Sequence, residues 1–125
     1  MTTTIFSIFF GGGLGAVSRY LICLNLSRFV HINLPFATFL VNIIGSFIIG
    51  FLYVFFIDRT DINPALKLAL TAGFCGGLTT FSTFSLELFE MVKNCQFLHA
   101  FVYALLSVVV CFIAVMIGVY VAKII

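Results

Sequence analysis

The chain of 125 residues contains few charged side chains. Six Lys or Arg and four Asp or Glu make up 8% of it, whereas about 25% is usual in soluble domains. This small number of charges cannot cover the surface of a water-soluble globule of this length. The composition therefore excludes a soluble domain. A net charge of +2 also excludes a basic surface for nucleic acid.

Several motifs are also missing. The four cysteines form no CxxC pair, so neither a zinc site nor a disulfide framework is indicated (Cys23, Cys75, Cys95, Cys111). No GxxxxGK[ST] phosphate loop occurs, so we expect neither ATP-driven transport nor enzyme activity. Residues 2–18 lack a basic start, which favours a first membrane helix over a cleaved signal peptide.

Hydrophobic residues make up 63% of the chain and gather in long runs without Lys, Arg, Asp or Glu. The runs cover residues 2–18, 29–57, 68–86 and 94–122. Since about 20 apolar residues cross a bilayer as a helix, we expect an all-α membrane protein. Residues 1–125 should form one domain of four transmembrane helices, at about residues 4–29, 35–57, 65–94 and 97–121. Consecutive helices should be antiparallel neighbours.

The positive charges are nearly balanced between the two predicted ends of the bundle. The end with both termini has Arg59, Lys67 and Lys123, and the other has Arg28 and Lys93. Because Lys and Arg normally mark the cytoplasmic side, two interpretations remain open. Either one orientation is weakly specified, or the chain inserts both ways and pairs as an antiparallel dimer. Four helices leave little room for an internal transport path, which also favours an oligomer.

Helices 2 and 4 carry polar side chains within their apolar runs. Thr38, Asn42 and Ser46 lie on one face of helix 2. The amide of Asn42 serves either as a hydrogen bond between packed helices or as a pore-lining group. On helix 4, Tyr103 and Ser107 add hydroxyls one turn apart beside a seam of small residues.

Residues 73–84 of helix 3, with the sequence GFCGGLTTFSTF, predict a helix broken in mid-membrane, because adjacent glycines and hydroxyl residues disfavour a helix interior. Freed carbonyls suit a cation. Ser82 and Thr83 are candidates to cap the second half. Phe81 and Phe84 should face one side of the helix. Their rings either form ordinary aromatic core or turn their positive edges toward an anion.

Arg19 is the one charge expected well inside a span, because Glu87 and Glu90 are expected near the end of helix 3. A proton-coupled exporter of cations needs a membrane carboxylate, so an arginine with amides and hydroxyls suits an anion better. Arg19 either attracts that anion or extends its head group to an interface as a structural residue.

Three segments together resemble the Fluc/CrcB family of fluoride channels. They are residues 12–20 (GGLGAVSRY), 38–47 (TFLVNIIGSF) and 73–84, and the likeness extends over nearly the whole chain. The resemblance implies a dual-topology antiparallel homodimer with two pores. It also implies a structural sodium ion at the dimer centre, held by the backbone carbonyls of Gly76 and Thr79 from each subunit.

The resemblance further implies which side chains line the fluoride path. They are Asn42, Phe81, Phe84, Ser82, Thr83, Tyr103 and Ser107; Arg19 matches an arginine that the family shares. The expected function is passive, fluoride-selective export across a bacterial-type inner membrane. The alternatives are a small multidrug-resistance-type four-helix transporter and an accessory membrane subunit, and ion selectivity in liposomes would distinguish them.

Overall fold

The computed structural model describes residues 1–29, 35–57, 59 and 61–125, and these residues form helices without any strand. In chain order the helices are α1 (Thr2–Phe29), α2 (Phe36–Ile57), α3 (Pro64–Leu68), the π-helical segment η1 (Ala69–Cys75), α4 (Gly76–Leu78), α5 (Phe81–Lys93) and α6 (Phe97–Ile124). The segments α3, η1, α4 and α5 follow one another as a bent rod, which we call helix 3.

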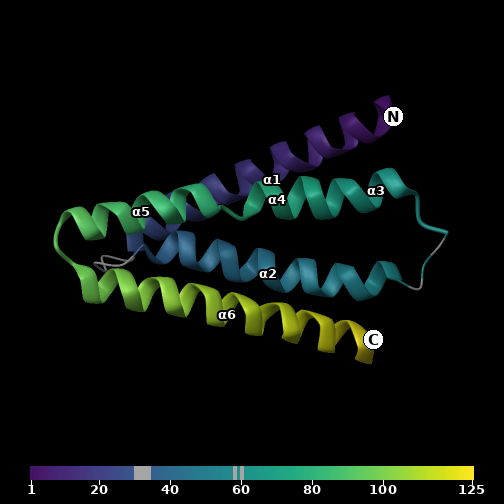
Figure 1. Ribbon diagram of the computed structural model, residues 1–125. Helices are drawn as coiled ribbons and strands as arrows, with labels where there is room; N and C mark the ends of the chain where they lie inside the picture. Colours follow the sequence, from purple (N-terminus) through teal and green to yellow (C-terminus); the bar gives the residue numbers. More distant parts are fainter. Residues whose placement is uncertain (30–34, 58, 60) are drawn as a thin grey trace.

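The helices lie side by side and alternate in direction along the chain (Figure 1). Both termini and the connection between α2 and α3 lie at one end of the bundle, and the ends of α1 and α5 lie at the other. Among the described residues, α1, α2 and α6 are each long and apolar enough to cross a membrane. Helix 3 runs beside them in shorter pieces, and the longest piece, α5, has 13 residues.

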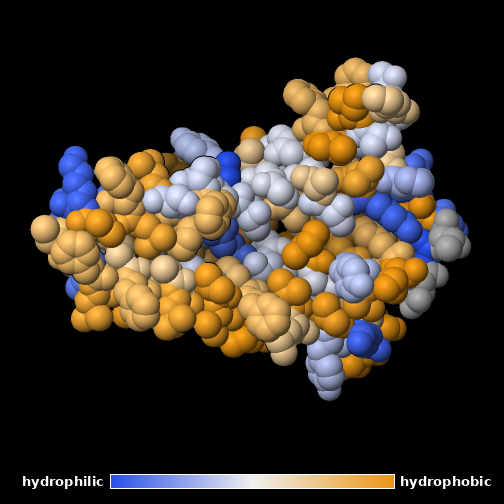
Figure 2. Space-filling model, viewed as in Figure 1, coloured by the Kyte–Doolittle hydropathy of each residue, from blue (hydrophilic) through white to orange (hydrophobic). Residues whose placement is uncertain are grey.

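Hydrophobic residues cover most of the visible face, and hydrophilic residues gather at its two ends (Figure 2). Large apolar side chains on the outer faces of α1 and α6 are well exposed, among them Phe9, Leu14, Phe101 and Phe112. A surface of this kind is stable in hydrocarbon and not in water. The chain is therefore a multi-pass membrane protein.

Glycines bring α1 and helix 3 into close backbone contact. A Cβ atom at Gly11 would overlap the carbonyl of Ala69, and one at Gly15 would overlap the carbonyl of Phe74. On the facing side, a Cβ atom at Gly77 would overlap the carbonyl of Gly12. The prediction that the spacing of Gly11 and Gly15 lets another helix approach is confirmed.

The small residues of α6 serve the same purpose toward α2. A Cβ atom at Gly118 would overlap the carbonyl of Phe47, and one at Gly50 would overlap the carbonyl of Val115. Ala100, Ser107 and Ala114 on the same seam are buried. The predicted close packing along helix 4 is therefore confirmed, and it fixes α6 against α2 on the side of the bundle away from α1.

Candidate functional site

Helix 3 is broken at Thr79 and Thr80, as the sequence predicts, but the glycines are not the break itself. Gly76 and Gly77 lie in the short helix α4, with an ordinary helical φ of −64° at Gly76. Thr79 (φ −81°, ψ 158°) and Thr80 (φ −150°, ψ 121°) have extended backbones. The glycines act through packing, since Gly77 must have no Cβ to touch α1.

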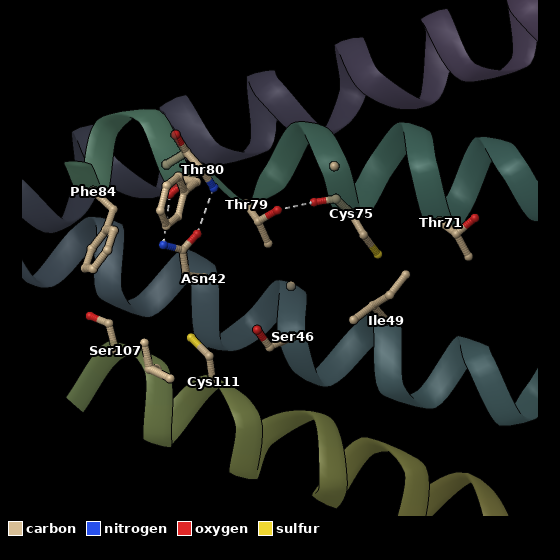
Figure 3. Close-up of a pocket in the computed structure, with 14 residues that line it drawn as sticks. Asn42, Ser46, Ile49, Thr71, Cys75, Thr79, Thr80, Phe84, Ser107 and Cys111 are labelled. Carbon is tan, nitrogen blue, oxygen red and sulfur yellow. Dashed lines mark hydrogen bonds between the residues drawn. The ribbon is translucent and has the colours of Figure 1, made fainter. Parts of the chain in front are cut away.

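The side-chain amide of Asn42 on α2 holds the break in place. Its Nδ2 donates to the Thr80 carbonyl at 3.1 Å, and its Oδ1 accepts from the Thr80 amide at 2.8 Å (Figure 3). In an uninterrupted α-helix the Thr80 amide would donate to the carbonyl of Gly76. Asn42 therefore substitutes for missing helical hydrogen bonds, and it frees the Gly76 carbonyl from its usual donor.

Thr80 caps the second half of helix 3. Its Oγ1 accepts from the Thr83 amide at 3.2 Å, and this amide would otherwise donate to the Thr79 carbonyl. Ser82 and Thr83 were predicted to be the caps, and this is wrong by two or three residues. Their side chains are exposed in the single chain, and each hydroxyl lies near Thr80 Oγ1, at 3.3 and 3.1 Å.

Arg19 on α1 reaches the same break from the opposite side. Its Nη1 donates to the Thr79 carbonyl at 3.1 Å, and its side chain is half-buried. The guanidinium thus lies inside the bundle at the centre of helix 3 and does not extend to an interface. Three helices converge here: α1 through Arg19, α2 through Asn42, and helix 3 through its non-helical backbone groups.

A cavity of about 500 Å³ opens beside the break, between α2, helix 3 and α6 (Figure 3). Of the predicted pore residues, Asn42, Phe81, Phe84 and Ser107 line it, together with Gly76 and Thr79 of the predicted sodium site. Ser82, Thr83, Tyr103 and Arg19 are not part of its lining. Ser46, noted on the same face of helix 2 as Asn42, also lines it; the lining residues that were not proposed as site residues include Ile49, Thr71, Cys75, Thr80 and Cys111.

Ser107 has an unusual environment within this cavity. The residue is 7% exposed, and its Oγ has no hydrogen-bond partner among the described residues. A buried hydroxyl without a partner is costly in an apolar surrounding. The Tyr103 side chain lies one turn earlier on the same face of α6, so its hydroxyl is the nearest polar group on that helix.

The two phenylalanines at the start of α5 have different surroundings. Their ring centroids are 5.7 Å apart with the planes tilted by 45°, so both rings lie on one side as predicted. Phe84 is 8% exposed and packs 5.1 Å from the Tyr103 ring, whereas Phe81 is 79% exposed. Phe84 belongs to the core of this chain, and Phe81 projects from it.

Glu87 is the site residue that the sequence analysis missed. It was expected near the end of helix 3, and it lies six residues before that end, in α5, where it is half-buried. Its Oε1 accepts from Thr38 Oγ1 at 2.6 Å, and its Oε2 accepts from Tyr103 Oη at 2.8 Å. The sequence gives no signal for these contacts, because both partners lie on other helices. The bundle therefore contains one carboxyl group bonded to both neighbouring helices.

Taken together, the long apolar helices, the broken helix and a mainly apolar cavity with a few polar side chains define a small helical membrane protein with an ion- or solute-sized site beside the break. Residues 6–119 match the family described as "CrcB-like protein, Camphor Resistance (CrcB)". The chain belongs to this family.

Curated relatives agree with this placement. A protein of Flavobacterium psychrophilum, "Fluoride-specific ion channel FluC", is 42% identical over 96% of this chain and 97% of its own. A Hahella chejuensis protein of the same name is 41% identical over 92% and 91%. "Fluoride-specific ion channel FluC 1" of Yersinia pestis is 46% identical over 75% and 73%.

Proposed function

We propose that the chain forms a fluoride-selective channel, without enzyme activity, that lets cytoplasmic fluoride leave the cell passively. Membership of the CrcB family and relatives named as fluoride-specific ion channels support the transported ion. The observation that carries the proposal to this chain's own residues is the cavity beside the broken helix, which Asn42, Phe81, Phe84 and Ser107 line together. The expected location is a bacterial-type inner membrane.

The cavity offers what a small, strongly hydrated anion needs. A selectivity path must replace the water around the ion by groups of the protein. Ser107 supplies a hydroxyl, Asn42 has a second N–H on its Nδ2, and Phe84 supplies a ring whose edge is positive. Ser82, Thr83 and Tyr103 are proposed as further polar groups along the fluoride path, on either side of the cavity.

We propose an antiparallel homodimer with two pores. In the single chain the break faces outward: Gly76 has open space within 4 Å of a Cβ position, and Phe81 is 79% exposed. A two-fold axis beside the break would bring both breaks together and give Phe81 a partner surface. The near-equal number of Lys and Arg at the two ends supports insertion in both orientations.

Backbone carbonyls at the break suit a sodium ion at the centre of that dimer. The Thr80 amide is taken by Asn42, and the Thr83 amide by Thr80 Oγ1, so Gly76 and Thr79 both lose their helical donors. Thr79 still accepts from Arg19, and a carbonyl oxygen has a second lone pair. In the described part of the chain, no cluster of three His, Cys, Asp or Glu offers a rival site. Bound sodium would brace the two breaks structurally.

A small multidrug-type transporter is the second candidate, because Glu87 supplies the membrane carboxylate that such a protein needs. Two hydrogen bonds already engage both oxygens of Glu87, which makes it a fixed structural group in this conformation. Family membership favours the channel.

The test is fluoride efflux from liposomes that contain the purified protein, followed with a fluoride electrode under a potassium diffusion potential. A channel should release fluoride and retain chloride without a proton gradient. Release that requires a proton gradient, or an absence of fluoride release in correctly folded protein, would refute the proposal.

The dimer and the sodium ion are tested separately. Labelling of a cysteine introduced near either terminus should find similar populations on the two sides of the membrane. The dimer should melt at a higher temperature in sodium than in potassium or N-methylglucamine, because a ligand bound only to the folded state stabilises it. Labelling from one side alone would contradict dual topology, and equal melting in all three cations would contradict the sodium site.

A further inference from the structure

Arg19 is a positively charged group inside the bundle whose role the proposed function leaves open. Its Nη1 donates to the Thr79 carbonyl at 3.1 Å, and its side chain is half-buried. Among the described residues, the carboxyl group of Glu87 accepts from Thr38 and Tyr103 instead. The charge of Arg19 is therefore directed at a backbone oxygen and not at a carboxylate.

The Thr79 carbonyl depends on Arg19 because the break has removed its helical donor. In a continuous helix the Thr83 amide would donate to this oxygen, but that amide donates to Thr80 Oγ1 at 3.2 Å. The hydroxyl and the amide of Thr79 itself both donate to the Cys75 carbonyl. A carbonyl without a donor is costly inside a membrane, so the bond from Arg19 stabilises the break in a single chain.

The oxygen that Arg19 contacts is also one of the proposed sodium ligands. A two-fold dimer would bring two such oxygens, and with them two guanidinium groups, around one ion. Each guanidinium and the ion would then share an oxygen atom. Two like charges at this separation repel each other strongly where little water screens them.

We propose that Arg19 competes with the sodium ion, so that it stabilises the break while sodium is absent and weakens sodium binding in the dimer. The inference rests on the proposed sodium site. Two effects of the side chain act in the same direction: its hydrogen bond lowers the energy of the sodium-free state, and its charge raises the energy of the sodium-bound state. Removal of Arg19 should therefore weaken the sodium-free fold and tighten the binding of sodium.

A purely positioning role for Arg19 gives the opposite expectation. If the guanidinium only orients the Thr79 carbonyl toward the ion, its removal misplaces a ligand and weakens sodium binding. The affinity for sodium therefore distinguishes the two roles. Fluoride efflux does not distinguish them, because either role predicts a disturbed break.

The test measures the melting midpoint of the purified full-length dimer while sodium replaces N-methylglucamine at constant ionic strength. Arg19→Met removes the charge and the donor. It should melt below wild type without sodium, rise further with sodium, and reach half of that rise at about tenfold less sodium or lower. Arg19→Lys keeps the charge and a donor, so it should need as much sodium as wild type. Lys123→Met is the control, because it removes an exposed positive charge in the last turn of α6.

Nuclear magnetic resonance of 15N-labelled arginine provides a second measurement on the wild-type dimer. The chain has three arginines, Arg19, Arg28 and Arg59, so the side-chain spectrum is simple. The guanidinium signal that is absent from Arg19→Lys belongs to Arg19. Sodium should speed the exchange of its protons with water, because the shared oxygen then holds the hydrogen bond less strongly. A positioning role predicts unchanged or slower exchange.

The outcomes separate this inference from the sodium site itself. If wild type melts higher in sodium but Arg19→Met needs as much sodium or more, the competition is overturned and the sodium site stands. If neither protein responds to sodium, the sodium site fails and this inference fails with it. If Arg19→Met does not assemble, the exchange measurement on wild type decides, and unchanged or slower exchange in sodium overturns the proposal.

Discussion

Replacement of Asn42 by alanine is the most informative single change, because one side chain both holds the break and lines the cavity. Asn42→Ala removes two hydrogen bonds to the Thr80 backbone, of 3.1 and 2.8 Å. Each such bond contributes about 1 kcal/mol net, and a buried backbone group left without a partner costs about 1–3 kcal/mol. We expect a loss of about 2–4 kcal/mol in the free energy of unfolding.

That loss should be visible as a fall of about 10 °C in the melting midpoint of the detergent-solubilised protein, since each kcal/mol corresponds to several degrees at this chain length. Fluoride efflux should fall with it, because a mobile break misplaces Phe84 and the carbonyls of Gly76 and Thr79. Ser46→Ala is the matched control. It shortens a polar side chain of the same cavity and the same face of α2 but leaves the bonds of Asn42 to Thr80 intact.

Asn42→Asp distinguishes the role of Asn42 in stabilising the break from its role in fluoride conduction. The carboxylate keeps an acceptor for the Thr80 amide, loses the donor to the Thr80 carbonyl, and places a negative charge beside the proposed anion path. It should melt above Asn42→Ala but conduct less fluoride. If Asn42→Ala melts like wild type, the reasoning that this amide holds the break is refuted, whatever happens to efflux.

Three further outcomes follow from the contacts around helix 3. Gly77→Ala should prevent normal folding because the new Cβ would overlap the Gly12 carbonyl. Gly76→Ala should fold, because a Cβ there meets nothing within 4 Å, and should disturb only dimer assembly and sodium dependence. Equal behaviour of the two variants in gel filtration and melting would contradict this contrast. Thr80→Val removes the cap of α5 and should lower the free energy of unfolding by about 1 kcal/mol. Ser85→Ala is the control, because the Ser85 side chain bonds only within α5, and its melting midpoint should stay unchanged. Tyr103→Phe leaves the Glu87 carboxyl group with one partner and should destabilise the protein by about 1–3 kcal/mol. A midpoint for Tyr103→Phe equal to wild type would show that the bond is dispensable.

The sequence predicted the coarse architecture because hydrophobic length and glycine spacing are local signals. The charge-free runs identified the long helices, and Gly11 with Gly15 predicted the close contact with helix 3. The break was predicted in the correct segment, but its centre was not. Whether Gly76 or Thr80 leaves the helix depends on hydrogen bonds from α1 and α2, which composition does not reveal.

The candidate site was predictable where polar residues share a helix face and unpredictable where three helices meet. Asn42 and Ser107 were singled out because amides and hydroxyls are rare in apolar runs. The role of Glu87 was missed because the residue was placed by its nearness to the end of helix 3. Its partners, Thr38 and Tyr103, lie on other helices and could not be seen in the sequence. A carboxylate in a bundle becomes interpretable only when its donors on other helices are known.

The division of helix 3 into short pieces has a consequence for how the protein is built in the membrane. Its longest piece, α5, has 13 residues, too few to cross a bilayer alone, and it contains Glu87, Glu90 and Lys93. The non-helical backbone of helix 3 at Thr79 and Thr80 is satisfied by Arg19 of α1 and Asn42 of α2. The stability of the third segment in the bilayer therefore depends on contacts with the first two helices.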